Sequence, residues 1–96
     1  MIFVINNLKY NTDKMELISD KCKWNYMYRT GILCGIRLYG RDVKLYKSEK
    51  NNWLLTYTGD YDVGNGIALD ENKVKSLLLN YDLDAYEKLF GELEEA

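Results

Sequence analysis

Twelve residues in the second half of the chain have the spacing of a calcium-binding loop. Acidic side chains stand at the first, third and twelfth positions of the string, which are Asp60, Asp62 and Glu71. An EF-hand loop needs glycine at its sixth position, where this chain has Asn65. It also needs a helix before the loop, whereas the preceding residues have the composition of a strand. We therefore interpret residues 60–71 as a polar, glycine-containing loop leading into a helix, and predict no metal site.

The composition argues against catalysis. The chain has no histidine, so the commonest general base and the Ser-His and Cys-His nucleophile pairs are missing. No glycine-rich phosphate-binding loop is present. The two cysteines, Cys22 and Cys34, form no CxxC pair, and in a reducing cytosol such residues usually behave as small buried hydrophobes. We predict a protein that is not an enzyme and that uses no cofactor.

A second group of residues combines aromatic rings with positive charge. In a strand, Trp24, Tyr26 and Tyr28 would share one face. The basic residues beside them are Lys21, Lys23 and Arg29. Aromatic stacking next to positive charge is how single-stranded nucleic acid is often held, but the same residue types also pack in sheets and anchor protein interfaces. Sheet packing, a protein-binding face and a nucleic-acid-binding face all remain open.

The charge of the chain is unevenly distributed. Residues 1–56 contain ten Lys and Arg against five Asp and Glu, whereas residues 57–96 contain three against ten. In the acidic part, one expected helix carries Asp84 and Glu87, and Glu92 lies near its end. Carboxylates on a helix can imitate a nucleic-acid backbone, but more often they form a solvated face that aids solubility. Asymmetry of this kind affects the steering of partners rather than the fold.

The residue patterns predict a single α+β domain over residues 1–96. Short strands are expected on either side of the turn-prone pair Asn6-Asn7, and Met15–Cys22 is ambiguous between strand and helix. Residues 36–57 predict a β-hairpin, with a bulge or bend at Gly40 and with Trp53–Tyr57 as its second strand. Two helices follow, the first with one apolar stripe formed by Val74, Leu77 and Leu78, and the second carrying Leu83, Tyr86, Leu89, Phe90 and Leu93. They begin at the N-cap Asp70 and at Asp82 or Asp84, with Gly91 near the end of the second. The expected architecture is a small antiparallel β-meander with one or two C-terminal helices packed on a face.

Length and hydropathy limit the classes of protein to which the chain can belong. Ninety-six residues suffice for one domain, and an apolar content of 47% is typical of globular chains. No apolar run approaches the ~20 residues that a membrane-spanning helix requires. The opening residues also lack the features of a signal peptide. We therefore expect a cytoplasmic protein with no membrane partner.

Several short motifs resemble those of a loose group of small proteins encoded by phages and other mobile elements of low-GC Gram-positive bacteria. Tyr10–Leu17 is similar to the group's Y-D-T-x-x-A-E-L opening. Leu45–Leu55 is similar to its L-Y-K-T-x-x-G-x-W-F-L hairpin. Ile67–Glu71 and Ala85–Glu92 are similar to its I-x-P-L-S-x-E-E-A and Y-E-x-x-F-G stretches. The resemblance implies a meander with C-terminal helices and transfers no catalytic residue.

Small proteins of such elements often bind and disable host machinery, and the leading hypothesis follows from that setting. It is a protein-binding module, of the kind represented by anti-CRISPR inhibitors, that binds a host defence complex such as a CRISPR effector. The predicted contacts are the aromatic-basic segment Trp24–Arg29, the loop of residues 60–66 with Asp60 and Asp62, and the acidic helix. The alternative is a small nucleic-acid-binding accessory protein that uses Lys21, Lys23, Trp24, Tyr26 and Arg29.

Overall fold

The computed structural model describes residues 1–28 and 36–96. Within these ranges, the strands are β1 (Ile2–Ile5), β2 (Leu8–Asn11), β3 (Glu16–Ser19), β4 (Asn25–Tyr28), β5 (Ile36–Tyr39), β6 (Arg41–Lys47), β7 (Trp53–Thr58) and β8 (Gly64–Leu69). The helices are α1 (Glu71–Tyr81) and α2 (Leu83–Phe90), with short 3-10 turns at Thr12–Lys14 and Asp60–Asp62. Neither α-helix is long and apolar enough to cross a membrane.

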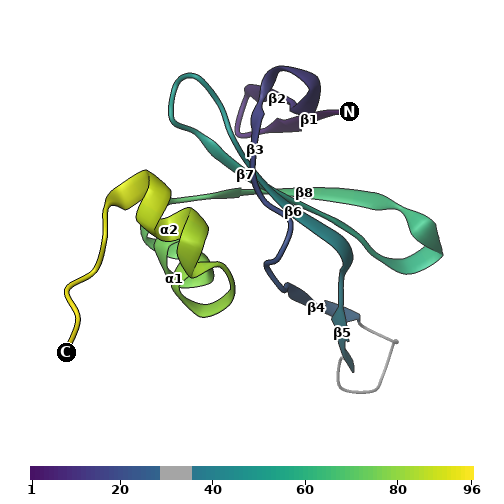
Figure 1. Cartoon of the computed structure of the whole chain (residues 1–96). Helices are drawn as coiled ribbons and strands as arrows, with labels where there is room; N and C mark the ends of the chain where they lie inside the picture. Colours follow the sequence, from purple (N-terminus) through teal and green to yellow (C-terminus); the bar gives the residue numbers. More distant parts are fainter. Residues whose placement is uncertain (29–35) are drawn as a thin grey trace.

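A four-stranded antiparallel sheet forms the centre of the molecule (Figure 1). Its order is β3-β6-β7-β8, in which β6, β7 and β8 follow one another as a meander. Two separate hairpins, β1–β2 and β4–β5, flank this sheet. The predicted α+β class, with an antiparallel meander followed by two C-terminal helices, is confirmed.

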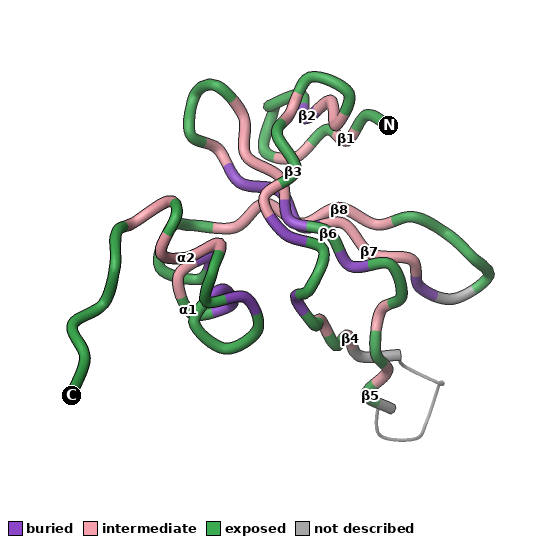
Figure 2. The backbone as a smooth tube through the Cα atoms, in the orientation of Figure 1, coloured by how far each residue is buried: buried purple, intermediate pink, exposed green. Residues whose placement is uncertain are grey.

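One face of the sheet packs against the helices. Alternate residues of the central strands, such as Leu45 and Leu55, meet Val74 and Leu78 of α1, and all four have no solvent exposure. The buried segments accordingly gather on the central strands and on α1 (Figure 2). The N-cap at Asp70 is as predicted, because its side chain accepts a hydrogen bond from the backbone N–H of Lys73 at 2.8 Å.

The N-terminal hairpin covers the opposite face. Asn6 and Asn7 form its two-residue turn with φ values of 52° and 64°, the left-handed backbone that a tight hairpin requires. On β8, a Cβ placed on Gly66 would lie 2.8 Å from the Phe3 ring, so glycine is needed for this close packing. Leu54 and Tyr10 are buried outside the helix-side cluster. The sheet therefore has a small second core on this side.

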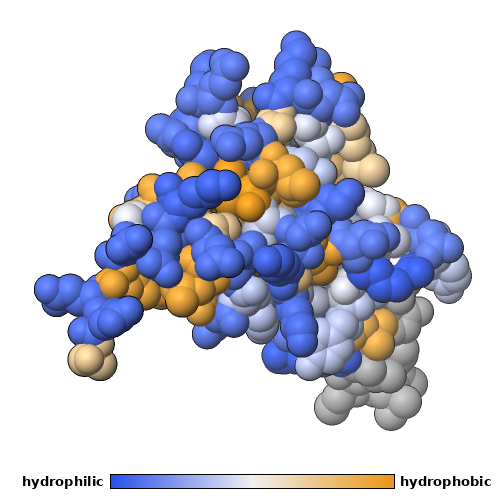
Figure 3. Space-filling view, viewed as in Figure 1, coloured by the Kyte–Doolittle hydropathy of each residue, from blue (hydrophilic) through white to orange (hydrophobic). Residues whose placement is uncertain are grey.

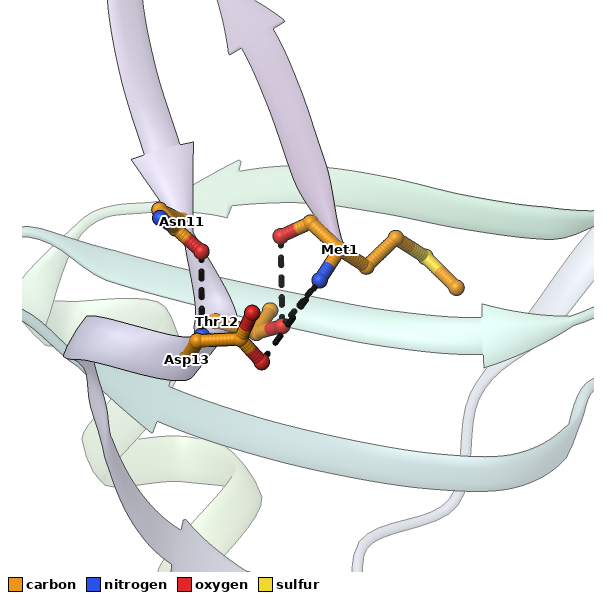
Figure 4. Close-up of polar contacts among 4 residues, drawn as sticks. All are labelled: Met1, Asn11, Thr12 and Asp13. Atoms are coloured by element: carbon orange, nitrogen blue, oxygen red, sulfur yellow. Dashed lines mark hydrogen bonds and ion pairs between the residues drawn. The ribbon is translucent and has the colours of Figure 1, made fainter.

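Polar contacts tie the base of the N-terminal hairpin to the turn that follows it (Figure 4). The amino group of Met1 donates to Thr12 Oγ1 at 3.1 Å and lies 3.8 Å from Asp13 Oδ1. The Thr12 backbone N–H in turn donates to the Met1 carbonyl at 2.9 Å. Asn11 caps the 3-10 turn by accepting from the Asp13 backbone N–H. These contacts hold the start of β1 against the 3-10 turn that follows β2.

Two predictions about local structure are corrected. Residues 36–47 were expected to form one strand of the hairpin with a bend at Gly40. The bend is present, but it separates two strands, and β5 pairs with β4 instead. A Cβ at Gly40 would lie 2.8 Å from the side chain of Tyr57, so the break occurs where only glycine fits. Residues 64–69 were expected to be loop, but they form β8 and pair with β7 along its whole length. Tertiary pairing overrides the weak strand propensity of Gly64-Asn65-Gly66.

Candidate protein-binding site

The turn between β7 and β8 presents an aromatic side chain to solvent in an unusual backbone conformation. Tyr61 and Asp62 have φ values of 57° and 56°, in the left-handed region that residues other than glycine rarely occupy. The Tyr61 side chain is 90% exposed, so no core contact explains this conformation. Backbone strain of this kind clusters at functional sites. We call Tyr61–Val63 the hairpin tip.

An arginine from the neighbouring strand braces the hairpin tip. Arg41, at the start of β6, donates from Nη2 to Asp62 Oδ1 at 2.5 Å and to the Gly59 carbonyl at 3.1 Å. The turn also closes through a hydrogen bond from the Gly59 N–H to the Val63 carbonyl at 3.0 Å. Both side chains of the ion pair are exposed, so it holds the geometry of the tip more than it stabilises the fold. These hydrogen bonds fix the backbone of the tip in one conformation.

The sheet edge next to the tip is open to strand pairing. Among the described strands, β8 pairs only with β7. Gly59 bonds to Val63, so antiparallel alternation turns the backbone groups of Gly64, Gly66 and Ala68 toward the free edge. The strand contains no charged residue and no proline, which are the usual means of blocking such an edge. The tip and this edge form one continuous surface.

Two aromatic residues of the predicted aromatic-basic segment, Trp24 and Tyr26, pack against the rest of the protein. Trp24 is half-buried against the helix-side core, and the ammonium group of Lys73 lies 5.8 Å from the centre of its ring. Tyr26 stacks on Tyr57, with ring centroids 5.2 Å apart. Its ring also lies beside Gly59, so the predicted aromatic segment and the hairpin tip are neighbours. Tyr28 ends β4, and Arg29 lies outside the described residues.

The lysines of this segment line a groove whose charges balance. Lys21 and Lys23 face it together with Asp20 and Asp42, and its aromatic wall includes Tyr39. Two positive and two negative side chains leave no net attraction for a phosphate backbone, whereas phosphate contacts supply most of the affinity of nucleic-acid binders. The groove therefore does not favour the nucleic-acid alternative.

The acidic helix lies on another side of the molecule. Asp84 and Glu87 of α2, with Glu92 just past its end, border a shallow depression next to Ile18. α2 ends at Phe90, and its C-cap is Gly91 with φ 95°, close to the end expected from the sequence. No described contact joins these carboxylates to the hairpin tip. Their proposed part in partner binding stays a prediction.

Asp82 has a structural role that separates it from the rest of the acidic group. It caps α2 by accepting from the Ala85 backbone N–H at 3.2 Å, as predicted for one of two candidate caps. Its other oxygen accepts a 2.6 Å hydrogen bond from the buried Ser19 hydroxyl of β3. The Ser19 hydrogen bond, more than the cap or Lys21, holds the pKa of Asp82 below its usual value. Asp82 thus links the edge strand to both helices.

The remaining predicted chemistry finds no assembled site in the described part of the chain. No group of three or more metal-binding side chains occurs there. Residues 60–71 do not form a calcium loop, since half of them belong to β8 and Asp62 pairs with Arg41. Cys22 is buried as predicted, and burial raises the pKa of its thiol, which disfavours the reactive thiolate. Cys34 lies outside the described residues.

Sequence reasoning selected the loop of residues 60–66 but missed its most prominent residue. Asp60 and Asp62 were named for their charge, whereas Tyr61 is the exposed side chain and Asp62 serves to fix the turn. No sequence signal marks a left-handed tyrosine, because its conformation depends on Arg41 and on the register of β7 with β8. Comparison with known proteins identifies no related site, because no protein-family model, curated protein or solved structure matches the chain.

Proposed function

We propose that the protein is a binding module, rather than an enzyme, and that the hairpin tip is its principal contact with a protein partner. The observation that carries this proposal is Tyr61, which is 90% exposed at the end of a hairpin whose backbone is held in place by Arg41. Tyrosine is among the residues that dominate binding energy at protein interfaces. Because hydrogen bonds already hold the backbone of the tip, binding costs little backbone entropy there.

The open edge of β8 supports the same proposal. An extended segment of a partner could add to this edge through the backbone groups of Gly64, Gly66 and Ala68, which is a common way of recognising proteins. Met1 and Phe3 cover Gly64 and Gly66 on the face toward the N-terminal hairpin, so a partner strand would approach in the plane of the sheet, where no long side chain of these three residues stands in its way. In that arrangement, main-chain hydrogen bonds provide affinity, and contacts at the tip with Tyr61 and Val63 provide specificity.

The resemblance to proteins of phages and mobile elements directs the search for the partner to host defence complexes, including CRISPR effectors. In this proposal the module inhibits its target by stoichiometric binding. The experiment is to express the tagged protein in a Gram-positive host with intact defence systems. What co-purifies is then identified with and without nuclease treatment. A single protein complex recovered under both conditions supports the proposal, whereas recovery that is lost with nuclease supports the nucleic-acid alternative.

Replacing Tyr61 with alanine is expected to weaken binding of the recovered partner by at least about 30-fold, the equivalent of the 2 kcal/mol that defines an interface hot spot. The affinity of the purified complex is measured by calorimetry. Tyr39→Ala is the matched control, since Tyr39 is also well exposed, at 69%, but lies on β5. Equal affinity for the Tyr61→Ala variant and the unchanged protein would exclude the tip as the principal contact.

A glycine at the same position is expected to stabilise the fold while still losing the partner. Tyr61→Gly removes the cost of a left-handed tyrosine, which is about 1 kcal/mol. The free energy of unfolding should rise by that amount, which moves the midpoint of urea unfolding to a higher concentration. Affinity for the partner should fall as in the alanine variant. A lower midpoint would show that the Tyr61 side chain stabilises the turn, and would argue against a conformation kept for binding.

A further inference from the structure

A groove lies at the other end of β7 from the hairpin tip, between the N-terminal hairpin and the turn joining β6 to β7. In Figure 3 these two segments form hydrophilic lobes with a notch between them. The groove encloses about 700 Å³, a volume typical of ligand sites. Its lining comes from β2, from Lys14 and Met15 just before β3, and from the β6–β7 turn. We call it the lysine groove.

Three lysines surround the groove without a partner for their charge. The amino groups of Lys9, Lys14 and Lys50 have no carboxylate within 4 Å among the described residues, where the ion pairs are those of Met1 and Arg41. The one acidic side chain in the lining is Glu49. The groove therefore carries a net charge of +2, from three positive side chains and one negative one. It is electrostatically complementary to an acidic ligand.

The floor of the groove is apolar. Leu8 is 49% exposed there, Met15 is half-buried, and Tyr10 is only 7% exposed. An inorganic anion would gain nothing from this floor. A nucleic acid would need aromatic faces on which to stack its bases, and the ring of Tyr10 is covered. The combination suits an aliphatic side chain flanked by carboxylates.

We propose that the lysine groove binds an extended acidic peptide segment of a partner protein, in which an aliphatic residue is flanked by Glu or Asp. The aliphatic side chain lies on Leu8 and Met15, and the flanking carboxylates pair with Lys9, Lys14 and Lys50. This inference goes beyond the proposed function, because it concerns a second surface and assigns the chemistry of what that surface takes. The two surfaces are separated by the length of β7, so a partner that contacts both would be held by two independent sites.

A peptide with the required pattern is available from the chain itself. Residues 91–96 read Gly-Glu-Leu-Glu-Glu-Ala, and all six are exposed. A fluorescently labelled peptide of this sequence serves as the probe, and binding to the full chain is followed by anisotropy. We expect saturable binding at one site that weakens as salt is raised, because exposed charge pairs are screened. A peptide with glutamine in place of its three glutamates, and one with serine in place of leucine, should each bind at least tenfold more weakly.

Protein variants locate the site. Lys14→Glu combined with Lys50→Glu should weaken the probe at least tenfold, whereas Lys23→Glu combined with Lys88→Glu, which makes the same charge change elsewhere, should leave affinity within twofold. Circular dichroism checks that both variants are folded. Equal losses in the two variants would show attraction to overall charge and would overturn the proposal, as would equal binding of the glutamine peptide.

Other ligands of the lysine groove would give different binding results. Tighter binding of an oligothymidylate than of the peptide would assign the groove to nucleic acid. Self-association of the full chain that is lost when its own Glu92, Glu94 and Glu95 become glutamine would assign it to a second copy. Either result would overturn the proposal. The outcome is independent of the hairpin tip, since Tyr61→Ala should leave probe affinity unchanged and the Lys14→Glu, Lys50→Glu variant should keep its contact at the tip.

Discussion

Replacing Trp24 with alanine is expected to lower the free energy of unfolding by about 2–3 kcal/mol. Replacing a fully buried tryptophan or phenylalanine with alanine costs about 3–5 kcal/mol. Trp24 is half-buried against the core, so the expected cost is smaller. Its ring also faces the ammonium group of Lys73, which adds a smaller contribution. A chain of this length has a total stability of about 5–14 kcal/mol, so the loss is a large fraction of it. Urea unfolding followed by fluorescence of Trp53 measures the change.

The same variant separates the two roles that the sequence left open for the aromatic segment. If Trp24 serves packing, the fraction of protein that remains folded should bind the partner within about twofold of the unchanged chain. Tyr39→Ala is again the control, because a side chain that is 69% exposed should contribute little to stability. A Trp24→Ala variant with unchanged stability and no partner binding would show instead that Trp24 contacts the partner.

The segments that could be predicted from sequence carry strong local signals. The cap at Asp70, the apolar stripe Val74-Leu77-Leu78 and the stop at Gly91 all depend on neighbours within one or two helical turns. The predicted strand Trp53–Tyr57 has an apolar, β-branched and aromatic composition suited to a central strand, and the structure extends it by one residue to Thr58. These features would be present in almost any fold of the chain, which is why they do not need the tertiary structure to be recognised.

The features that could not be predicted depend on distant contacts. β8 begins with Gly64-Asn65-Gly66, whose glycines are explained only by the Phe3 ring and Met1 packing over them. The period-2 alternation of Trp24 and Tyr26 did predict a shared face. Alternation cannot say whether that face meets solvent or a covering layer, and here it meets Tyr57 and the core. The proposed site lies in the loop that the sequence singled out, but the proposal rests on Tyr61 rather than on Asp60 and Asp62.

The charge asymmetry noted in the sequence has a spatial counterpart. Unpaired positive charge surrounds the lysine groove on the N-terminal side of the sheet, and the carboxylates of Asp84 and Glu87 lie on the helix side. A partner carrying both an acidic segment and a basic patch would be oriented by this arrangement as it approaches. Orientation of this kind affects the association rate, and it should weaken with salt while contacts at Tyr61 do not.

Replacing Asp82 with alanine is expected to cost about 3 kcal/mol of stability at neutral pH. The change removes the cap of α2, worth about 1 kcal/mol, and leaves the buried hydroxyl of Ser19 without its acceptor, at a cost of about 1–3 kcal/mol. Ser19→Ala should cost less, because Asp82 Oδ1 can still accept from the Ala85 backbone N–H and cap the helix. In the double variant the losses should not add, since both report on one hydrogen bond.

The charge of Asp82 makes part of this stability depend on pH. The pKa of Asp82 is lowered in the folded protein, chiefly by the Ser19 hydrogen bond, so its contribution is complete above the unfolded pKa of about 3.9 and is lost as pH falls through the folded pKa. Asp82→Asn keeps an oxygen that can accept from Ala85 but removes the charge. The difference in unfolding free energy between the unchanged protein and this variant should therefore be constant from pH 7 to about 5 and should shrink below pH 4. A difference that stayed constant to pH 2 would show that the link between β3 and the helices does not depend on the carboxylate charge.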